Sequence, residues 1–271
     1  MSEMTYSLGH SSAEIQRLAN QGAMLQPITE RLLRNAGIDA GMRVLDLGCG
    51  AGDVSMLAAK LVGPTGSIVG IDRSQEVLNV AKERAREAGL RQISFVHSSI
   101  EAFSAREPFD LVVGRYILVH QLEPVAVLRN AAQLLRPGGA LAFHEARLGD
   151  DNKSLPDVPL WDLTVNLTRI ALRSMVPNYH GADRLVEHFC EAGLPYPHLF
   201  CEKLVAGGPD SPLYGSLAEL FRTLQPQLEK MGVTPTKTIG IEGLESRLRD
   251  AVIEARSQIF GPGQVCAWAR L

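Results

Sequence analysis

Short apolar segments alternate with amphipathic ones from residue 42 to residue 146, and this alternation constrains the fold more than any other feature of the chain. We expect strands at 42–48, 67–72, 93–98, 109–115 and 140–146, and helices at 53–63, 74–89 and 123–139. Strands that alternate with helices in this way form a parallel sheet covered on both faces. The sequence therefore predicts an α/β fold with a doubly wound sheet.

The flanking segments add helices on either side of this core. A capping box at Ser11–Glu14 begins one helix, and Pro27 is expected to begin a second that stops at Gly37. Residues 147–181 are expected to be irregular and apolar-rich; helices are then expected at 182–193, 211–232 and 243–261, and strands at 198–208 and 264–271. We therefore expect one domain, in which residues 1–146 form a capped first half and residues 147–271 complete the sheet and supply lid insertions.

Composition limits the class of partner. The 271 residues are 45% hydrophobic and 21% charged with a net charge of −3, which gives no electrostatic footprint for nucleic acid or an anionic membrane. The four cysteines lack the spacing of a zinc site. The first residues do not resemble a secretion signal, and no apolar run reaches the ~20 residues of a membrane span. We expect a cytoplasmic monomer or homodimer.

The segment VLDLGCGAGD, residues 44–53, places three glycines between the first expected strand and its helix. In open parallel sheets ligands bind beyond the carboxyl ends of the strands, where the strand order reverses. Glycines there let the backbone adopt positive φ and let a ligand approach closely. A tight turn without a ligand is the simpler alternative for Gly48, Gly50 and Gly52.

Two carboxylates separate the possible nucleotide ligands. A dinucleotide fingerprint reads G-x-G-x-x-G, but here Asp53 stands at the position of its third glycine. Asp46 would repel a pyrophosphate and attract a cationic group. Asp72 ends the second expected strand, where a carboxylate can accept both ribose hydroxyls. Together these residues indicate a nucleoside with a cationic end, and S-adenosylmethionine is such a molecule.

Three motifs at this order and spacing carry a resemblance to a known family. VLDLGCGAGDVS, IVGIDRS and LLRPGGALAFHE resemble the main motifs of class I S-adenosylmethionine-dependent methyltransferases, over roughly residues 40–146. YSLGHSSAEIQRL resembles the N-terminal cap of members that act on small molecules, including quinone precursors. The resemblance implies a Rossmann-like, seven-stranded, mostly parallel sheet with helical cap and lid insertions. It also implies S-adenosylmethionine as cofactor and S-adenosylhomocysteine as product.

The resemblance also implies a set of cofactor-binding residues. They are Tyr6, Asp46, Leu47, Gly48, Cys49, Gly50, Asp72, Arg73, Ser99, Ile100, Gly114 and Arg115. Cys49 is interpreted as a small packed side chain rather than a nucleophile. The family often has an acidic residue after the third strand to bind the adenine amino group, whereas this chain has Ser98 and Ser99 there. A serine hydroxyl or a backbone carbonyl would have to replace it.

Candidates for acceptor chemistry come from the ends of the fourth and fifth expected strands and from the lid. His120, His144, Tyr179 and His180 are candidate catalytic residues, and Arg115, Glu145, Trp161 and Tyr179 are candidate substrate contacts. Histidine is the general base best matched to neutral pH. Each has a structural alternative: an ion pair for Arg115, a packed aromatic for Trp161, and a structural histidine for His120 and His144.

The reaction class is narrowed by what the motifs lack. Metal-dependent catechol-type enzymes place carboxylates directly after the fourth and fifth strands, and GRYI at 114–117 is not the Asn/Asp-Pro-Pro-Tyr motif of base or glutamine methylation. We therefore expect no metal and a small, hydrophobic organic acceptor, with O-methylation favoured over N- or C-methylation. A non-methylating S-adenosylmethionine-binding protein and an NAD-type oxidoreductase remain as alternatives.

Overall fold

The computed structural model describes residues 12–149, 152–233 and 239–271, and its centre is a seven-stranded sheet. The strand order is β3-β2-β1-β4-β5-β10-β7. β10 runs antiparallel to its neighbours β5 and β7, and the remaining pairs are parallel. The bounds are β1 Arg43–Leu47, β2 Ser67–Asp72, β3 Ile93–His97, β4 Phe109–Arg115, β5 Leu135–Ala146, β7 His198–Glu202 and β10 Gln264–Arg270. The expected Rossmann-like sheet is confirmed.

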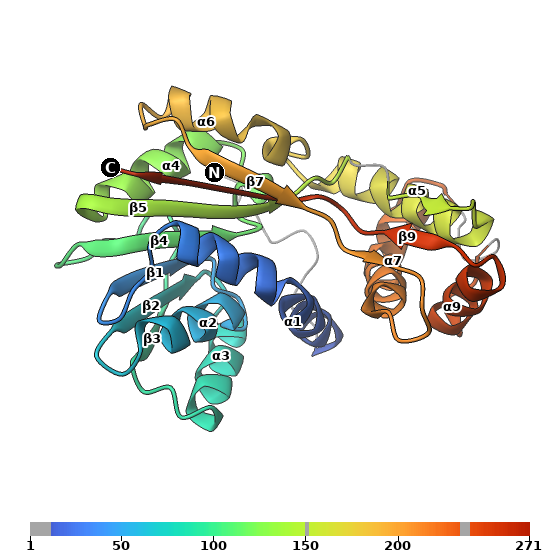
Figure 1. Ribbon diagram of the computed structural model, residues 1–271, viewed down its shortest axis with the longest axis horizontal. Helices are drawn as coiled ribbons and strands as arrows, with labels where there is room; N and C mark the ends of the chain where they lie inside the picture. Colours follow the sequence, from blue (N-terminus) through green and yellow to red (C-terminus); the bar gives the residue numbers. More distant parts are fainter. Residues whose placement is uncertain (1–11, 150–151, 234–238) are drawn as a thin grey trace.

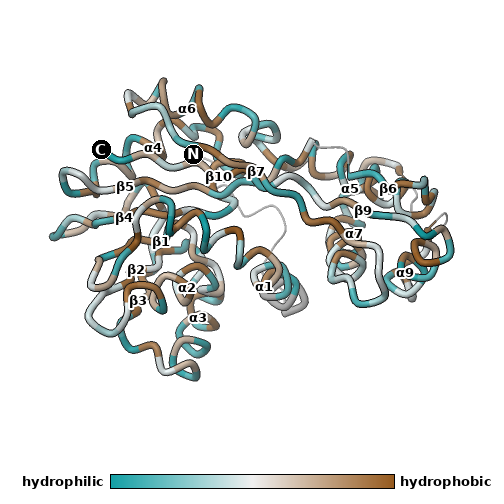
Figure 2. The backbone as a smooth tube through the Cα atoms, viewed as in Figure 1, coloured by the Kyte–Doolittle hydropathy of each residue, from teal (hydrophilic) through white to brown (hydrophobic). Residues whose placement is uncertain are grey.

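Helices cover both faces of the sheet (Figure 1). One face is covered by α1 (Ser12–Asn35), α2 (Asp53–Val62) and α3 (Gln75–Glu87), and the other by α4 (Pro124–Gln133) and α6 (Leu185–Glu191). Because the side chains of successive strand residues point to opposite faces of the sheet, those of β1 pack into two hydrophobic cores. Leu45 and Leu47 pack on the α4 and α6 side, whereas Val44 packs on the α1 and α2 side. Figure 2 shows these strands as hydrophobic segments inside the layers.

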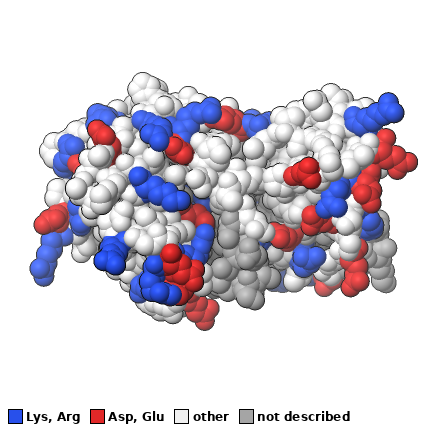
Figure 3. Space-filling model, turned by 60° about the horizontal axis from the view of Figure 1, so that its bottom comes forward, with Lys and Arg blue, Asp and Glu red and all other residues white. Residues whose placement is uncertain are grey.

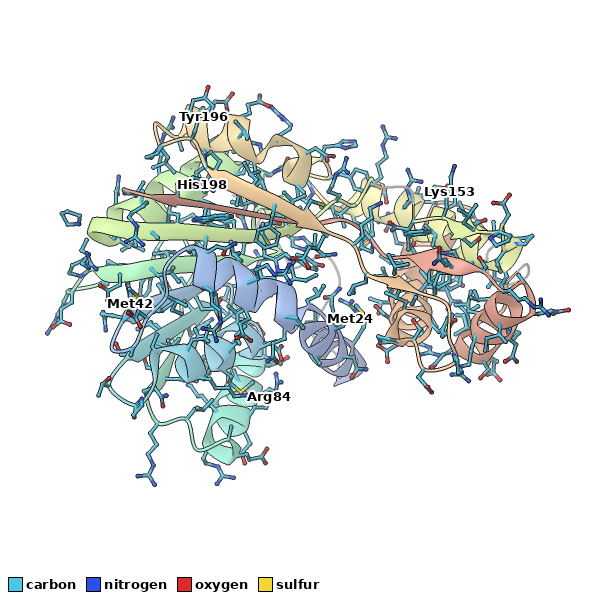
Figure 4. The ribbon with its side chains drawn as sticks, viewed as in Figure 1. Met24, Met42, Arg84, Lys153, Tyr196 and His198 are labelled. Carbon is cyan, nitrogen blue, oxygen red and sulfur yellow. The ribbon has the colours of Figure 1, made fainter. Side chains whose placement is uncertain are left out.

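A third hydrophobic core lies inside a smaller lobe, here called the lid. It consists of α5 (Pro159–Met175), α7 (Pro212–Lys230), α9 (Leu244–Glu254) and a small sheet of β6 (Ser154–Leu155), β9 (Gln258–Phe260) and β8 (Val205–Ala206). Trp161 and Tyr214 meet edge to face at its centre. Met24, near the middle of α1, packs against this core, and Figure 4 shows it on the side of α1 toward the lid. Two insertions, after β5 and between β7 and β10, thus form one unit over one end of the sheet.

The structure corrects the expected break at Pro27. α1 continues through Pro27 as one helix. A proline inside a helix costs about 3 kcal/mol through a lost hydrogen bond and a clash. Leu25 and Ile28 on either side of it are buried, as are Leu32 and Leu33 further on, and burying each such side chain contributes roughly 1.5–3 kcal/mol. The apolar stripe outweighs the proline, so the helix does not end there.

Other boundaries also differ from expectation, each through contacts distant in sequence. Residues 147–181 are not irregular, because α5 occupies 159–175 with Trp161, Val165 and Leu172 buried along one side. The expected strand 198–208 divides into β7 and β8, and the expected helix 243–261 ends at Glu254 and is followed by β9. The expected helix 123–139 ends at Gln133, so its Pro-Gly-Gly stop lies inside β5.

Candidate functional site

A cavity of about 260 Å³ lies beyond the carboxyl ends of β1 and β4, where the strand order reverses. The β1–α2 loop, the ends of β2 and β4, helix α1 and the lid all contribute to its walls. Several predicted site residues line it, namely Asp46, Gly48, Cys49, Gly50, Asp72, Arg73, Ser99, Ile100, Arg115 and His120. Leu47 is the last residue of β1, and Gly114 is the next-to-last residue of β4. Tyr6 lies outside the described residues.

The loop after β1 depends on glycine at two positions. Gly48 and Gly50 have φ values of +59° and +52°, a region that favours glycine. A Cβ on Gly48 would collide with Cδ1 of Ile117, whereas a Cβ on Gly50 would meet no atom within 4 Å. Gly48 therefore allows close packing against the segment after β4, and Gly50 leaves open space toward the cavity.

Asp72 ties this loop to β2. Its carboxylate accepts the backbone N–H of Gly50 at 3.0 Å and that of Ser74 at 2.9 Å. A carboxylate has about four lone-pair positions, so two N–H donors leave capacity for further hydroxyl donors. Asp72 lines the cavity, and its geometry fits the ribose end of the cofactor.

Asp46 is a carboxylate buried inside β1. It is 1% exposed, and Ser55 Oγ donates to it at 2.6 Å. Burial raises the pKa of Asp46 to about 7, although the Ser55 hydrogen bond and the nearby Arg115 oppose this shift. A carboxylate held near its pKa beside a cavity favours a cationic ligand over a phosphate. This observation fits the sulfonium and ammonium of S-adenosylmethionine.

Asp53 occupies the position where a dinucleotide-binding loop has its third glycine. Its carboxylate pairs with Arg84 at 2.8 Å, and Arg84 also donates to the carbonyl of Ala51 at 2.7 Å. Figure 4 shows Arg84 on the α2 and α3 side of the sheet. A Cβ on Gly22 of α1 would lie 2.7 Å from Cγ of Asp53. The residues present therefore fit a loop clamped by an ion pair under α1, and they do not fit a dinucleotide.

Cys49 and the two serines behave as local structural groups. Cys49 is buried, and burial raises the pKa of its thiol, so the thiolate needed for nucleophilic attack is disfavoured. Ser98 Oγ donates to the carbonyl of Ser99 at 3.0 Å, and Ser99 Oγ accepts the N–H of Ala102 at 3.2 Å. Ser99 Oγ still has a proton to donate, and Glu101 brings a carboxylate to the same wall.

Arg115 ends β4, and His120 lies in the segment that follows it; both line the cavity. Arg115 Nη1 donates to Thr29 Oγ1 at 3.4 Å. His120 ends the short helix η1 (Leu118–His120). Burial lowers the pKa of His120 to about 4, and the charges of Arg73 and Arg17 add to this effect. The imidazole is therefore neutral at physiological pH and weakly basic.

The structure does not bring His144 to the cavity. It is fully buried, and its Nδ1 lies 3.0 Å from Thr29 Oγ1 while its Nε2 lies 3.0 Å from Gln264 Oε1. Gln264 donates its amide N–H to the carbonyl of Pro262, so its oxygen faces His144 and Nε2 carries the proton. Burial lowers the pKa of His144 to about 3. Both ring nitrogens are occupied inside the protein, which favours a structural role over the predicted catalytic one.

Glu145 also turns away from the cavity. Its carboxylate accepts the backbone N–H groups of Ile117, Leu118 and Val119 at 2.9, 2.8 and 3.3 Å. Burial nevertheless raises its pKa to about 7. Glu145 therefore positions η1, and with it His120. It is not among the residues that line the cavity, and its contact with a substrate stays a prediction.

The predicted aromatic and histidine contacts of the lid lie outside the cavity wall. Trp161 is in the lid core, and its Nε1 donates to the carbonyl of Asn152 at 2.9 Å. The Tyr179 hydroxyl donates to the carbonyl of Leu148 at 2.7 Å. His180 is exposed and lies 3.6 Å from a carboxylate oxygen of Asp183. These contacts favour structural roles for Trp161 and Tyr179, and the roles predicted for all three side chains stay predictions.

Sequence reasoning missed the wall that closes the cavity. Its residues come from α1, from the segments after β4 and β5, and from the lid: Arg17, Leu18, Gln21, Tyr116, Ile117, Val119, Leu148, Leu172, Val176 and Leu220. The apolar spacing along α1 predicted a helix, whereas the segment of α5 was expected to be irregular. Neither pattern revealed that apolar residues of these two helices face a cavity.

Comparison with known proteins now identifies the family. A model described as a methyltransferase domain matches residues 38–176, just over half of the chain. The chain belongs to this family. A demethylmenaquinone methyltransferase of Listeria welshimeri is 32% identical over 187 residues, which cover 62% of this chain and 75% of that protein.

Two further comparisons agree. The aklanonic acid methyltransferase DauC of Streptomyces is 36% identical over 143 residues, or 52% of this chain and 64% of that protein. A crystal structure of an S-adenosylmethionine-dependent methyltransferase from Aquifex aeolicus has the same fold, with a TM-score of 0.53, 21% identity, and coverage of 71% of this chain and 91% of that one. The protein is a class I methyltransferase, and S-adenosylmethionine is its cofactor.

Proposed function

We propose that the protein transfers a methyl group from S-adenosylmethionine to an oxygen of a small, hydrophobic organic molecule. One observation carries this proposal: a single cavity joins the glycine loop of β1 to apolar side chains of the lid. Leu172 and Val176 of α5 and Leu220 of α7 form that apolar wall. A wall of this kind favours an apolar acceptor next to the cofactor.

The cofactor, when bound, supplies a methyl group on a positively charged sulfur. The chain's own residues then bind and orient. Asp46 is placed to attract the cationic end, and Asp72 to accept the ribose hydroxyls. The lid and α1 exclude water, and the enzyme must hold the acceptor about 3–3.5 Å from the methyl carbon, in line with the bond that breaks.

The names of the relatives support a small organic acceptor. One relative is named for demethylmenaquinone and another for aklanonic acid. We propose that this chain acts on a molecule of similar size and polarity, as one domain working as a cytoplasmic monomer or homodimer.

The part of the chain that the structure describes contains no helix that could span a membrane.

The distribution of charged side chains on the surface supports the proposal that the substrate is not a polynucleotide. On the face shown in Figure 3, the described Lys and Arg side chains are interspersed with Asp and Glu. A nucleic acid would instead favour a continuous basic track.

The proposal is tested by incubating the purified protein with S-adenosylmethionine and a panel of phenols, carboxylic acids, amines and activated carbon acids. Formation of S-adenosylhomocysteine with an O-methylated product, identified by mass spectrometry and NMR, supports the proposal. Methyl transfer only to nitrogen or carbon contradicts the preference for oxygen. Tight binding of NADH without binding of S-adenosylhomocysteine contradicts the whole assignment.

A further inference from the structure

Tyr116, the residue that follows β4, has a left-handed backbone with a φ of +57°. Among the described residues other than glycine, only Tyr116 and Arg256 have a positive φ. For a bulky side chain this conformation costs free energy, and it persists only where the surrounding contacts hold it in place. Residues of this kind cluster at functional sites, and Tyr116 lines the cavity.

The contacts that hold Tyr116 come from β5 and β10. Its backbone N–H donates to the carbonyl of His144 at 2.8 Å, and its ring meets the His144 ring edge to face with the centroids 5.8 Å apart. Its hydroxyl donates to Oε1 of Gln264 at 2.7 Å. Gln264 is the first residue of β10 and pairs with Ala146 of β5. The end of β10 thus helps to hold the turn that follows β4.

Both polar atoms of the Gln264 amide have partners inside the protein. Its Oε1 accepts the Tyr116 hydroxyl and also lies 3.0 Å from Nε2 of His144. Its Nε2 donates to the carbonyl of Pro262 at 3.0 Å. The side chain is buried, and a buried amide with partners on both sides has a fixed orientation. Gln264 therefore gives the Tyr116 hydroxyl one fixed point of attachment.

The turn at Tyr116 sets the position of Ile117, which also lines the cavity. The Cδ1 atom of Ile117 occupies the space that a Cβ on Gly48 would need. Glu145 accepts the backbone N–H of Ile117 at 2.9 Å and fixes the chain just after the turn. The conformation of Tyr116 determines the direction in which the chain leaves β4, and therefore how Ile117 packs on the glycine loop.

We propose that Gln264 is a positioning residue for cofactor binding, and that it acts through the Tyr116 hydroxyl. Their contact keeps the turn after β4 in the conformation that packs Ile117 on Gly48. The last strand of the chain therefore contributes to the affinity for S-adenosylmethionine, although Gln264 is not among the residues that line the cavity. This inference rests on the proposed function only through its cofactor, and not on the acceptor.

Calorimetric titration with S-adenosylhomocysteine tests this inference. Tyr116→Phe removes only the hydroxyl and should lower the affinity about 3- to 10-fold, as the loss of one hydrogen bond would. Gln264→Leu should lower the affinity about 10- to 50-fold, because Tyr116 and His144 lose their shared acceptor. Gln264→Glu keeps an oxygen acceptor on a side chain of the same length, and it should retain most of the affinity that Gln264→Leu loses. Equal losses in these two variants would contradict the role of the Gln264 oxygen.

Tyr214→Phe is the matched control for Tyr116→Phe. Tyr214 is buried in the lid core, and its hydroxyl donates to the carbonyl of Gly208 at 3.1 Å. Urea unfolding measures the stability that each variant loses, and Tyr214→Phe should leave the affinity for S-adenosylhomocysteine unchanged. Equal losses of affinity in the two Tyr→Phe variants would show that affinity only follows stability, and would overturn the inference.

A double-mutant cycle tests whether the two residues act through one contact. Tyr116→Phe/Gln264→Leu should bind S-adenosylhomocysteine no more weakly than Gln264→Leu alone, because the contact is already lost. Additive losses, or unchanged affinity in Tyr116→Phe, would overturn the inference. If Gln264→Leu does not fold, the comparison of Tyr116→Phe with Tyr214→Phe is sufficient. Failure of the native protein to bind would contradict the proposed function itself, whereas native binding without these differences contradicts this inference alone.

Discussion

The carboxylate of Asp72 accepts the backbone N–H of Gly50 at 3.0 Å, so that the end of β2 fixes the loop that follows β1. One residue therefore shapes the glycine loop and faces the cavity. This coupling links the two motifs: the carboxylate that we propose to bind the ribose also orients the glycine loop, which would approach the rest of the nucleoside.

Replacing Asp72 by alanine should weaken cofactor binding by about 1.5–3 kcal/mol, because charge-assisted hydrogen bonds to the ribose and to the loop are lost. Calorimetric titration with S-adenosylhomocysteine measures this change. Glu87→Gln, at the exposed end of α3, serves as the control with unchanged affinity. Unchanged affinity in Asp72→Ala would remove the ribose assignment.

Gly89, which follows the end of α3, is the matched control for Gly50 of the glycine loop. Both have positive φ, +52° and +68°, and a Cβ on either would meet no atom within 4 Å. Alanine at each position should cost a similar ~1–2 kcal/mol of folding stability through the left-handed backbone. Only Gly50→Ala should also lower the affinity for S-adenosylhomocysteine, because its methyl group enters the cavity. Equal affinities in the two variants would contradict the role of Gly50.

Asp46 predicts a pH dependence with a definite sign. Its pKa in the folded protein is about 7, against the ordinary aspartate value of 3.8, so between these values the folded protein holds a proton that the unfolded chain has released. This group therefore lowers the free energy of unfolding as the pH rises from about 4 to about 7. In Asp46→Asn this contribution should be absent, as measured by urea unfolding across that range.

Ionised Asp46 should also favour the cationic cofactor. With a pKa of about 7, its ionised fraction rises about tenfold from pH 6 to pH 8. The affinity for S-adenosylmethionine should rise by up to that factor in the native protein. A difference between pH 6 and pH 8 that is the same in Asp46→Asn would show that another group is responsible.

His144 should matter for folding rather than for chemistry. His144→Ala removes the hydrogen bonds that join the ring to Gln264 and Thr29 and leaves a cavity inside the protein, which should cost about 1–3 kcal/mol of stability. Unfolding in denaturant measures this loss. The shape of the pH–rate profile for methyl transfer should stay the same. Loss of its limb at low pH, where a general base becomes protonated, would restore His144 as a candidate base.

Local patterns in the sequence predicted the sheet and the cofactor wall. The strands of the first half needed only short apolar runs, and the glycines and Asp72 carry their chemistry at fixed offsets from those runs. The place of His144 and Glu145 was also correct, at the end of β5. Their roles were not predictable, because Thr29 and Gln264, the partners of His144, are 115 and 120 residues away.

The lid and α1 were harder to predict for the same physical reason. Pro27 is a strong local signal for a helix start, yet burial of leucines against distant elements carries α1 past it. The sequence around Trp161 is compatible with a position in a hydrophobic core or in a pocket wall. Its edge-to-face contact with Tyr214, which is distant in sequence, places it in the core of the lid. The spacing of apolar residues predicts which side chains share a face of a helix. It does not predict whether that face packs against another element or lines a cavity.

The most direct test of the account is a crystal structure of the protein with S-adenosylhomocysteine. We predict that both ribose hydroxyls lie within hydrogen-bond distance of the Asp72 carboxylate and that the sulfur lies beside the glycine loop, with Arg115 on the acceptor side. S-adenosylhomocysteine bound elsewhere, or in the cavity with Asp72 making no contact to the ribose, would contradict it.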